Sequence, residues 1–165
     1  MKLNIVMCEP EIPQNTGNIA RTCAAIGAKL HLIHPLGFLI DNKYLKRAGL
    51  DYWDKLEIEE HQSLEKFLEK YPPEENNMFF ASSKSKHCYS DIDYNKMDEV
   101  FVMYGPETRG LPEDLLQKYM DKCIRIPMRP GLRCLNLSNS VAIISYEIFK
   151  QSGFDGLQEV SEYFE

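Results

Sequence analysis

The chain has 165 residues, of which 44% are hydrophobic, and a formal net charge of −6 at pH 7. This is enough apolar material for one packed core and too little length for two, so we predict a single domain over residues 1–165. The acidic balance excludes indiscriminate binding to polyanions, because such binding depends on Lys and Arg neutralising phosphates. Any contact with nucleic acid must therefore be local.

In chain order, short apolar runs alternate with segments of helical period. The pattern predicts a strand at 3–8, a helix at 16–26, strands at 30–33 and 56–60, a helix at 63–71, strands at 78–82 and 100–104, a helix at 112–120, a strand at 123–126 and a helix at 138–151. The tail 155–165 is expected to be a short amphipathic helix or a frayed end. The alternation predicts an α/β fold with a parallel sheet.

Cysteine and histidine usage bears on compartment and metal content. The five cysteines are scattered, with no C-x-x-C spacing of a zinc or redox site, and the first residues fit neither a signal peptide nor a membrane span. We therefore expect a cytoplasmic protein with no membrane partner. His31, His34, His61 and His87 have no carboxylate or cysteine partner at metal-ligand spacing, which predicts no metal site.

Polar segments follow several predicted strands, at the edge where open α/β sheets bind ligands. The first runs from 13 to 22 and places Asn15 and Thr16 at a helix start, with Arg21 one turn further on. Such a helix start suits a phosphate or a ribose, and ordinary capping by Asn15 or Thr16 is the alternative. Arg21 is either held by a packed neighbour or directed into the crevice.

The second polar segment, 101–113, joins a buried strand to a helix that Pro112 opens. Gly105 allows the backbone to approach a ligand closely. Glu107 and Arg109 could pair with each other or orient substrate groups. The alternative is a tight turn with a surface ion pair.

The third polar segment, 124–140, lies in a basic stretch: the residues from Lys122 to Asn139, both included, contain four basic and no acidic side chains. In an acidic chain this reversal favours a loop that steers a phosphate backbone, and a solvated face with a helix cap from Asn136 or Ser138 is the alternative.

Two further basic clusters have the same two interpretations. The loop 82–87 and the trio Lys43, Lys46 and Arg47 could contact RNA, or could be exposed surface.

Segments 15–21, 105–112 and 126–140 together resemble, in order and spacing, the three signature motifs of the SPOUT methyltransferases. The match covers nearly the whole chain. The opening 4–13 and the segment 47–52 are similar to the group that methylates the ribose 2′-hydroxyl of the tRNA wobble nucleotide. The resemblance implies the SPOUT α/β-knot fold, a parallel sheet with helices on both faces and a carboxyl-terminal deep trefoil knot, which general topology rules disfavour.

The resemblance also implies a homodimer, formed through the terminal helices, that binds S-adenosylmethionine and releases S-adenosylhomocysteine. The substrate would be the anticodon loop of tRNA, with cytidine or carboxymethylaminomethyluridine at the wobble position and leucine isoacceptors expected. The implied cofactor residues are Ala81, Gly105, Ile126, Cys134, Leu135 and Asn136, with Cys134 standing where related sequences often have serine. The implied catalytic residues are Arg21 and Asn15, and the implied RNA-binding or supporting residues are Glu107, Arg109, Arg129, Arg133, Ser138 and Tyr146.

Several alternatives stay open on the sequence. Arg21 is the family's candidate base, but a guanidinium is always protonated, so it could instead stabilise an oxyanion or hold a phosphate. Tyr146 could belong to the core or to a dimer interface. Other functions are methylation of a different tRNA or rRNA nucleotide, a non-catalytic RNA-binding module, or a generic nucleotide-binding protein, which the absence of G-x-G-x-x-G and G-x-x-x-x-G-K-[ST] disfavours.

Overall fold

The computed structural model describes residues 1–40, 52 and 55–163. Lys43, Lys46, Arg47 and most of the segment 47–52 therefore lie outside the described residues. The strands form a six-stranded sheet in the order β3-β2-β1-β5-β4-β6, and every pairing is parallel, as predicted. The strands are β1 (Lys2–Cys8), β2 (Lys29–Ile33), β3 (Ile58–His61), β4 (Met78–Ala81), β5 (Glu99–Tyr104) and β6 (Cys123–Ile124).

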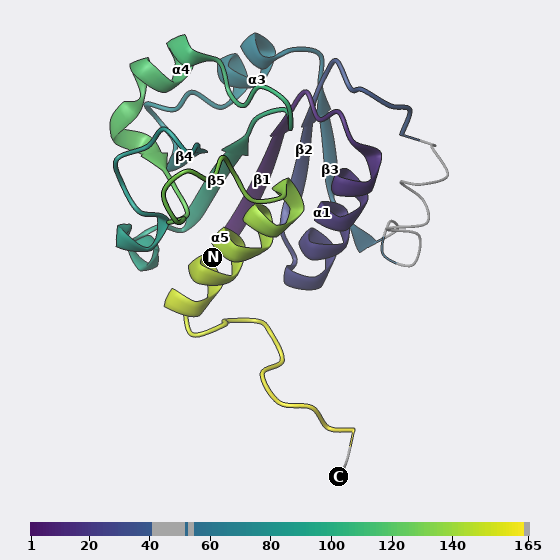
Figure 1. The fold of residues 1–165 in the computed structure, drawn as a ribbon. Helices are drawn as coiled ribbons and strands as arrows, with labels where there is room; N and C mark the ends of the chain where they lie inside the picture. Colours follow the sequence, from purple (N-terminus) through teal and green to yellow (C-terminus); the bar gives the residue numbers. More distant parts are fainter. Residues whose placement is uncertain (41–51, 53–54, 164–165) are drawn as a thin grey trace.

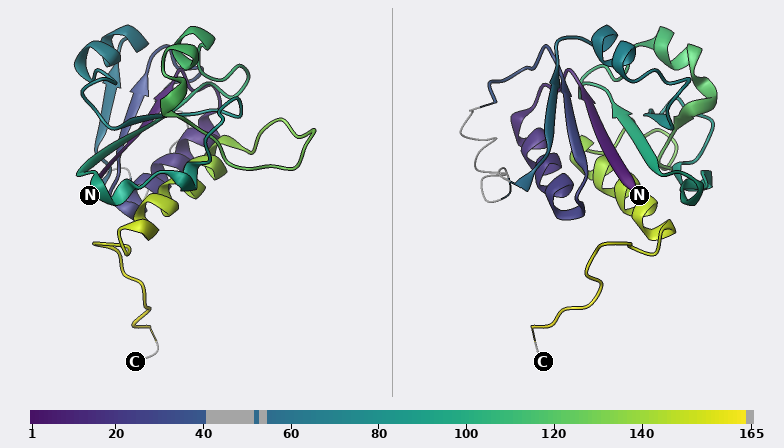
Figure 2. Two further views of the ribbon diagram at one scale, coloured as in Figure 1. Left: turned by 90° about the vertical axis from the view of Figure 1, so that its left-hand side faces the viewer. Right: turned by 180° about the vertical axis from the view of Figure 1, so that it is seen from behind.

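Helices cover both faces of this sheet (Figures 1 and 2). Helices α1 (Pro13–Ile26) and α5 (Leu137–Gln151) pack side by side on one face, and α3 (Leu64–Lys70) and α4 (Glu113–Lys118) lie on the other. The prediction of an α/β fold with helices on both faces is confirmed. Among the described residues, no helix has the length and apolar character needed to cross a membrane.

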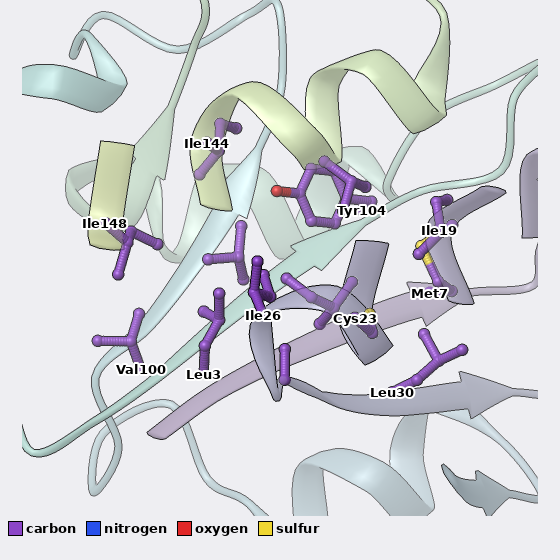
Figure 3. Packing of buried hydrophobic residues seen from close by; sticks show 14 of the residues in the cluster. Leu3, Met7, Ile19, Cys23, Ile26, Leu30, Val100, Tyr104, Ile144 and Ile148 are labelled. Atoms are coloured by element: carbon purple, nitrogen blue, oxygen red, sulfur yellow. The ribbon is translucent and has the colours of Figure 1, made fainter. Parts of the chain in front are cut away.

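The core follows from the alternation of side chains along buried strands. Ile5 and Met7 of β1 point to the α1–α5 side, and Val6 points to the α3–α4 side. Figure 3 shows the α1–α5 side, where Leu3, Met7, Leu30 and Tyr104 meet Ile19 and Cys23 of α1 and Ile144 and Ile148 of α5. Burying one such aliphatic side chain stabilises the fold by about 1.5–3 kcal/mol.

The ends of the elements differ from the predictions in a few places. Helix α1 begins at Pro13, before the predicted start, so Asn15 and Thr16 lie inside its first turn and cap nothing. Strand β6 is only Cys123–Ile124, and the backbone of Arg125 continues instead into a bridge with Cys88. The short 3₁₀ helices Tyr89–Asp91 and Tyr94–Lys96 were not predicted. Beyond α5 the tail has no helix up to residue 163 and extends away from the body (Figure 1).

A buried polar network lies on the α3 side of β1, β2 and β3, and it corrects the expectation that the histidines have no carboxylate partner. His31 Nδ1 lies 3.0 Å from His61 Nε2, and His61 Nε2 lies 3.5 Å from a Glu59 oxygen. His34 pairs with Glu60 at 2.6 Å. Spacing along the sequence does not reveal the network because its members come from adjacent parallel strands, where His31 and Glu59 are in register.

The hydrogen bonds fix which nitrogens carry protons. Asn4 Nδ2 donates to Glu99, so Asn4 Oδ1 faces His31 Nε2 at 3.0 Å and must accept its proton. His31 Nδ1 is then the acceptor, and His61 Nε2 donates to it. His31 is neutral in this arrangement, and burial lowers the pKa of His61 as well.

Glu59 carries the negative charge of the network and is fully engaged. It forms ion pairs with Lys29 at 2.9 Å and Lys70 at 2.6 Å, and it accepts the Tyr71 hydroxyl at 3.1 Å. Burial acts to raise the pKa of Glu59, but the hydrogen bonds from Lys70 and Lys29 lower it to about 2. His31, His61 and Glu59 offer ligand atoms of the types that metals bind, and within the described residues these atoms already serve a network of hydrogen bonds and ion pairs.

Acid should destabilise the protein through this network. Burial, followed by the neighbouring His61, lowers the pKa of His31 to about 4. Between that value and the ordinary histidine pKa, the unfolded chain binds a proton that the folded chain refuses, so stability falls as pH falls. We expect the free energy of unfolding to drop by about 2 kcal/mol from pH 7 to pH 5 through His31, measured by urea denaturation.

The matched variants are His31→Gln, which should lose most of this pH dependence, and His87→Gln at an exposed histidine, which should keep it. An equal pH dependence in His31→Gln and the wild type would contradict the assignment.

Candidate active site

A cavity of about 510 Å³ opens at the carboxyl ends of β1, β4, β5 and β6. The chain leaves β1 toward β2 and β3 and later returns to place β5 on the other side of β1, which makes this edge the switch point where such sheets bind ligands. Most of the predicted site residues line it, namely Asn15, Ala81, Gly105, Glu107, Arg109, Ile126, Arg133, Cys134, Leu135 and Asn136. The fold thus brings the three polar segments together.

Glu107 connects the loop after β5 to the start of α1. Its carboxylate accepts the backbone N–H groups of Glu11 at 2.8 Å and Ile12 at 3.1 Å, and the Asn15 side-chain amide at 3.3 Å. Helix α1 has no side-chain cap of its own at Ile12. Glu107 binds the two backbone N–H groups that precede the helix and a side chain in its first turn, and its charge complements the positive end of the helix. Glu107 therefore acts as a structural anchor of the site.

Asn136 connects the third segment to the same point. Its Nδ2 donates to Asn15 Oδ1 at 3.1 Å, and its Oδ1 accepts the backbone N–H groups of Ser138 at 2.9 Å and Asn139 at 3.4 Å. The predicted helix cap by Asn136 is confirmed, because Asn136 is the N-cap residue of α5. A chain of hydrogen bonds thus joins Glu107, Asn15 and Asn136, one residue from each polar segment.

Arg109 is engaged within the chain. Its guanidinium pairs with the carboxylates of Glu9 and Glu11, and Thr108 Oγ1 also donates to Glu11 at 2.9 Å. The predicted alternative of a Glu107–Arg109 pair is therefore wrong, because Glu107 accepts the N–H groups of Glu11 and Ile12, and Arg109 pairs with Glu9 and Glu11. The side chain of Arg109 remains 60% exposed at the cavity rim.

Gly105 is required by a close approach of backbone to backbone. A Cβ at this position would lie 2.3 Å from the carbonyl carbon of Gly110 and 2.3 Å from the nitrogen of Leu111. The loop 105–110 therefore closes on itself, which the sequence had suggested only as an approach to a ligand.

Replacing Gly105 by alanine should open this loop. Because the clash is with backbone atoms that cannot move aside, we expect a loss of about 3 kcal/mol in the free energy of unfolding. Gly110→Ala is the control: its Cβ would meet nothing within 4 Å, and only its φ of +70° is strained, at about 1 kcal/mol. Urea denaturation measures the free energy of unfolding of both variants. Equal losses in the two variants would contradict the close backbone approach as the cause.

Four predicted residues do not line the cavity. Arg21 is exposed on α1 with its guanidinium 5.2 Å from the centre of the Tyr52 ring, so the predicted packed neighbour exists and the crevice is not reached. Arg129 is exposed, and Ser138 donates its hydroxyl to Asn136 at 2.6 Å. Tyr146 is 47% exposed on α5, so the prediction of a core position for it is wrong.

The basic residues near the third segment have different roles. Lys122 donates to the backbone oxygens of Pro73 and Asn76 and holds a turn, so it does not belong to a basic surface. Lys84 lines the cavity and pairs with Glu113 at 2.5 Å. Arg125, which no prediction singled out, also lines the cavity. Its position directly after an apolar strand, as for Glu9 after β1, was the signal available.

The loop 82–87 is only partly the exposed surface that the sequence suggested. Ser82 and Ser83 line the cavity, and Ser85 is buried and donates to the carbonyl of Cys123 at 2.5 Å. Tyr104 also lines the cavity; among the described residues its buried hydroxyl finds no hydrogen-bond partner.

Solved structures share this architecture. A structure described as giving insights into the 2-OH methylation of C/U34 on tRNA superposes with a TM-score of 0.86 at 40% identity, covering 93% of this chain and 97% of that chain. The methyltransferase AviRb from Streptomyces viridochromogenes, in complex with AdoMet, has a TM-score of 0.78 at 20% identity and covers 92% of this chain and 60% of that chain. At that identity the second likeness concerns the fold.

Relatives by sequence agree. The tRNA (cytidine(34)-2′-O)-methyltransferase of Escherichia coli (strain K12) is 45% identical over 155 residues, covering 93% of this chain and 96% of the relative. The protein of the same name from Burkholderia ambifaria is 42% identical over 154 residues, covering 93% of this chain and 97% of the relative. The model of the SpoU rRNA methylase family matches residues 2–146. The chain therefore belongs to the SpoU rRNA methylase family.

Proposed function

We propose that this protein is a cytoplasmic, S-adenosylmethionine-dependent methyltransferase that modifies the ribose 2′-hydroxyl of the tRNA wobble nucleotide. The observation that carries the proposal is the hydrogen-bonded link Glu107–Asn15–Asn136, which assembles the three family motifs around one cavity. The activity named for the relatives from E. coli and B. ambifaria supports the substrate. The proposal includes the trefoil knot that the family resemblance implies.

The cavity suits the cofactor in size and lining. Its volume of about 510 Å³ falls in the range of small-molecule sites, and apolar Ala81, Ile126 and Leu135 provide surfaces for an adenine ring. The close loop 105–110 brings backbone N–H and C=O groups to the same place. Bound there, S-adenosylmethionine would supply a methyl group on a sulfonium, whose sulfur is a good leaving group.

The residues of this chain would then supply alignment and charge. Glu107, Asn15 and Asn136 satisfy one another and the termini of α1 and α5, so they hold the walls of the cavity rigid, which favours a near-attack geometry. Because both oxygens of Glu107 already accept N–H groups, proton removal by this carboxylate is disfavoured.

Arg21 is the residue proposed to act on the reacting ribose. Its guanidinium stays protonated, so it would stabilise developing negative charge on the 2′-oxygen or hold the adjacent phosphate. It is exposed on α1, outside the cavity of its own chain, with its guanidinium over the Tyr52 ring.

A homodimer is part of the proposal because the chain exposes apolar side chains at the start of α1 and along α5. Ile12, Ile143 and Tyr146 are 41%, 36% and 47% exposed. A second copy packed over α1 and α5 would bury them and would place Arg21 beside a cavity that it does not reach in a single chain. Tyr146 would then serve the interface or the RNA bound across it.

Transfer of a radiolabelled methyl group from S-adenosylmethionine to tRNA lacking wobble ribose methylation tests the function. We expect label in 2′-O-methylcytidine or its uridine counterpart at the wobble position after nuclease digestion. Arg21→Ala should lower the rate by at least about 100-fold, the scale of losing one group that stabilises an oxyanion. Lys96→Ala, at an exposed lysine paired only with Asp93 among the described residues, should not.

Label at another tRNA position or in rRNA would reassign the substrate within the enzyme class. Binding of S-adenosylhomocysteine without any methyl transfer would favour the non-catalytic RNA-binding module instead.

Tyr146→Glu should weaken the dimer, because it places a charge in an apolar contact. We expect a shift from dimer to monomer in sedimentation equilibrium, with an unchanged circular dichroism spectrum. Lys66→Glu, whose side chain is 62% exposed on α3 at the opposite face of the sheet, is the control for added negative charge. A wild-type protein that sediments as a monomer would refute the dimer.

A further inference from the structure

The positive charges lining the cavity are unevenly satisfied. Lys84 pairs with Glu113, and Arg109 pairs with Glu9 and Glu11. In the described part of the chain, the side chains of the other two lining cations, Arg125 and Arg133, form no hydrogen bond or ion pair.

The carboxylate of the cavity forms no ion pair with them. Glu107 is the acidic residue among the lining residues, and its oxygens accept the N–H groups of Glu11, Ile12 and Asn15. Two guanidinium groups at the cavity therefore have no ion-pair partner among the described residues.

Arg125 differs from Arg133 in how firmly it is placed. Its backbone N–H donates to the carbonyl of His87 at 2.9 Å, and its carbonyl accepts the N–H of Tyr89 at 3.0 Å, which extends the parallel pairing of β6. Arg133 lies in the irregular loop between β6 and α5 and is exposed, whereas Arg125 is partly buried. A group held on a strand extension positions a ligand better than one on a loop.

Arg125 is partly buried as a residue, and a guanidinium that loses hydration without gaining an anionic partner is costly. An anionic ligand in the cavity would offset that cost. The planar fork of the guanidinium matches a carboxylate, with two parallel N–H···O bonds. In S-adenosylmethionine the one anionic group is the α-carboxylate of the methionine part.

We propose that Arg125 binds a ligand oxyanion in this cavity, and that this oxyanion is the methionine carboxylate of the cofactor. The inference rests on the proposed function, since it assigns a role toward the cofactor of that function. It adds Arg125 as a residue that distinguishes S-adenosylmethionine from analogues without the carboxylate.

Calorimetric titration of the full chain with S-adenosylmethionine and with decarboxylated S-adenosylmethionine tests the assignment. We expect the wild type to prefer the intact cofactor by about 10- to 100-fold, the value of a charge-assisted bidentate contact. Arg125→Met should bind the intact cofactor more weakly by the same factor and should lose the preference, and Arg125→Lys should keep part of it. Lys96→Met, with the same change in net charge at an exposed site, should behave like the wild type.

The second arm measures tRNA binding against salt concentration. If Arg125→Met leaves cofactor affinity unchanged but weakens tRNA binding and reduces the salt slope by about one, the oxyanion is an RNA phosphate and the carboxylate assignment is overturned. If both affinities are unchanged in a folded variant, Arg125 binds no oxyanion and the proposal fails. A wild type that binds neither cofactor form would instead refute the cofactor of the proposed function.

Discussion

The carboxylate of Glu107, which accepts the two backbone N–H groups that lead into α1, is the interaction on which the site depends. Helix α1 begins without a side-chain cap, and Glu107 binds the N–H groups of Glu11 and Ile12 just before it from the loop after β5. Asn15 donates to Glu107 and accepts from Asn136 at the start of α5. The positions of two helix termini and one loop are therefore set by the same few hydrogen bonds.

The sheet explains why these groups can meet. Parallel pairing of β1 with β5 puts the ends of both strands at one edge, where the polar segments that follow them face each other. The two faces of the sheet serve different purposes. The α1–α5 face carries the cavity walls and exposed apolar side chains, and the α3 face encloses the histidine pair with its charged partner Glu59.

Most of the architecture followed from periodicity, because buried parallel strands produce apolar runs and the helices between them repeat at helical spacing. The cavity residues of the three motifs were also found, since motif order constrains which strand ends converge. The predictions that failed concern contacts between residues distant in sequence. Asn15 was expected as a possible cap, but it lies inside the first turn of α1 and its side-chain amide donates to Glu107, 92 residues away. The contacts among Glu59, His61 and His31 could be predicted only with the strand register known. Arg125 was overlooked because it stands out as an unpaired cation only when the ion pairs of Lys84 and Arg109 are known.

The hydrogen bond from Asn136 to Asn15 spans 121 residues, and the contacts of Glu107 span more than 90. During synthesis, α1 leaves the ribosome long before the groups that fix its first turn exist. The cavity can therefore be completed only after nearly the whole chain has emerged. A truncated or stalled product that lacks α5 would have much of the sheet and still no formed binding site, so the dependence of the site on remote partners restricts cofactor binding to finished chains.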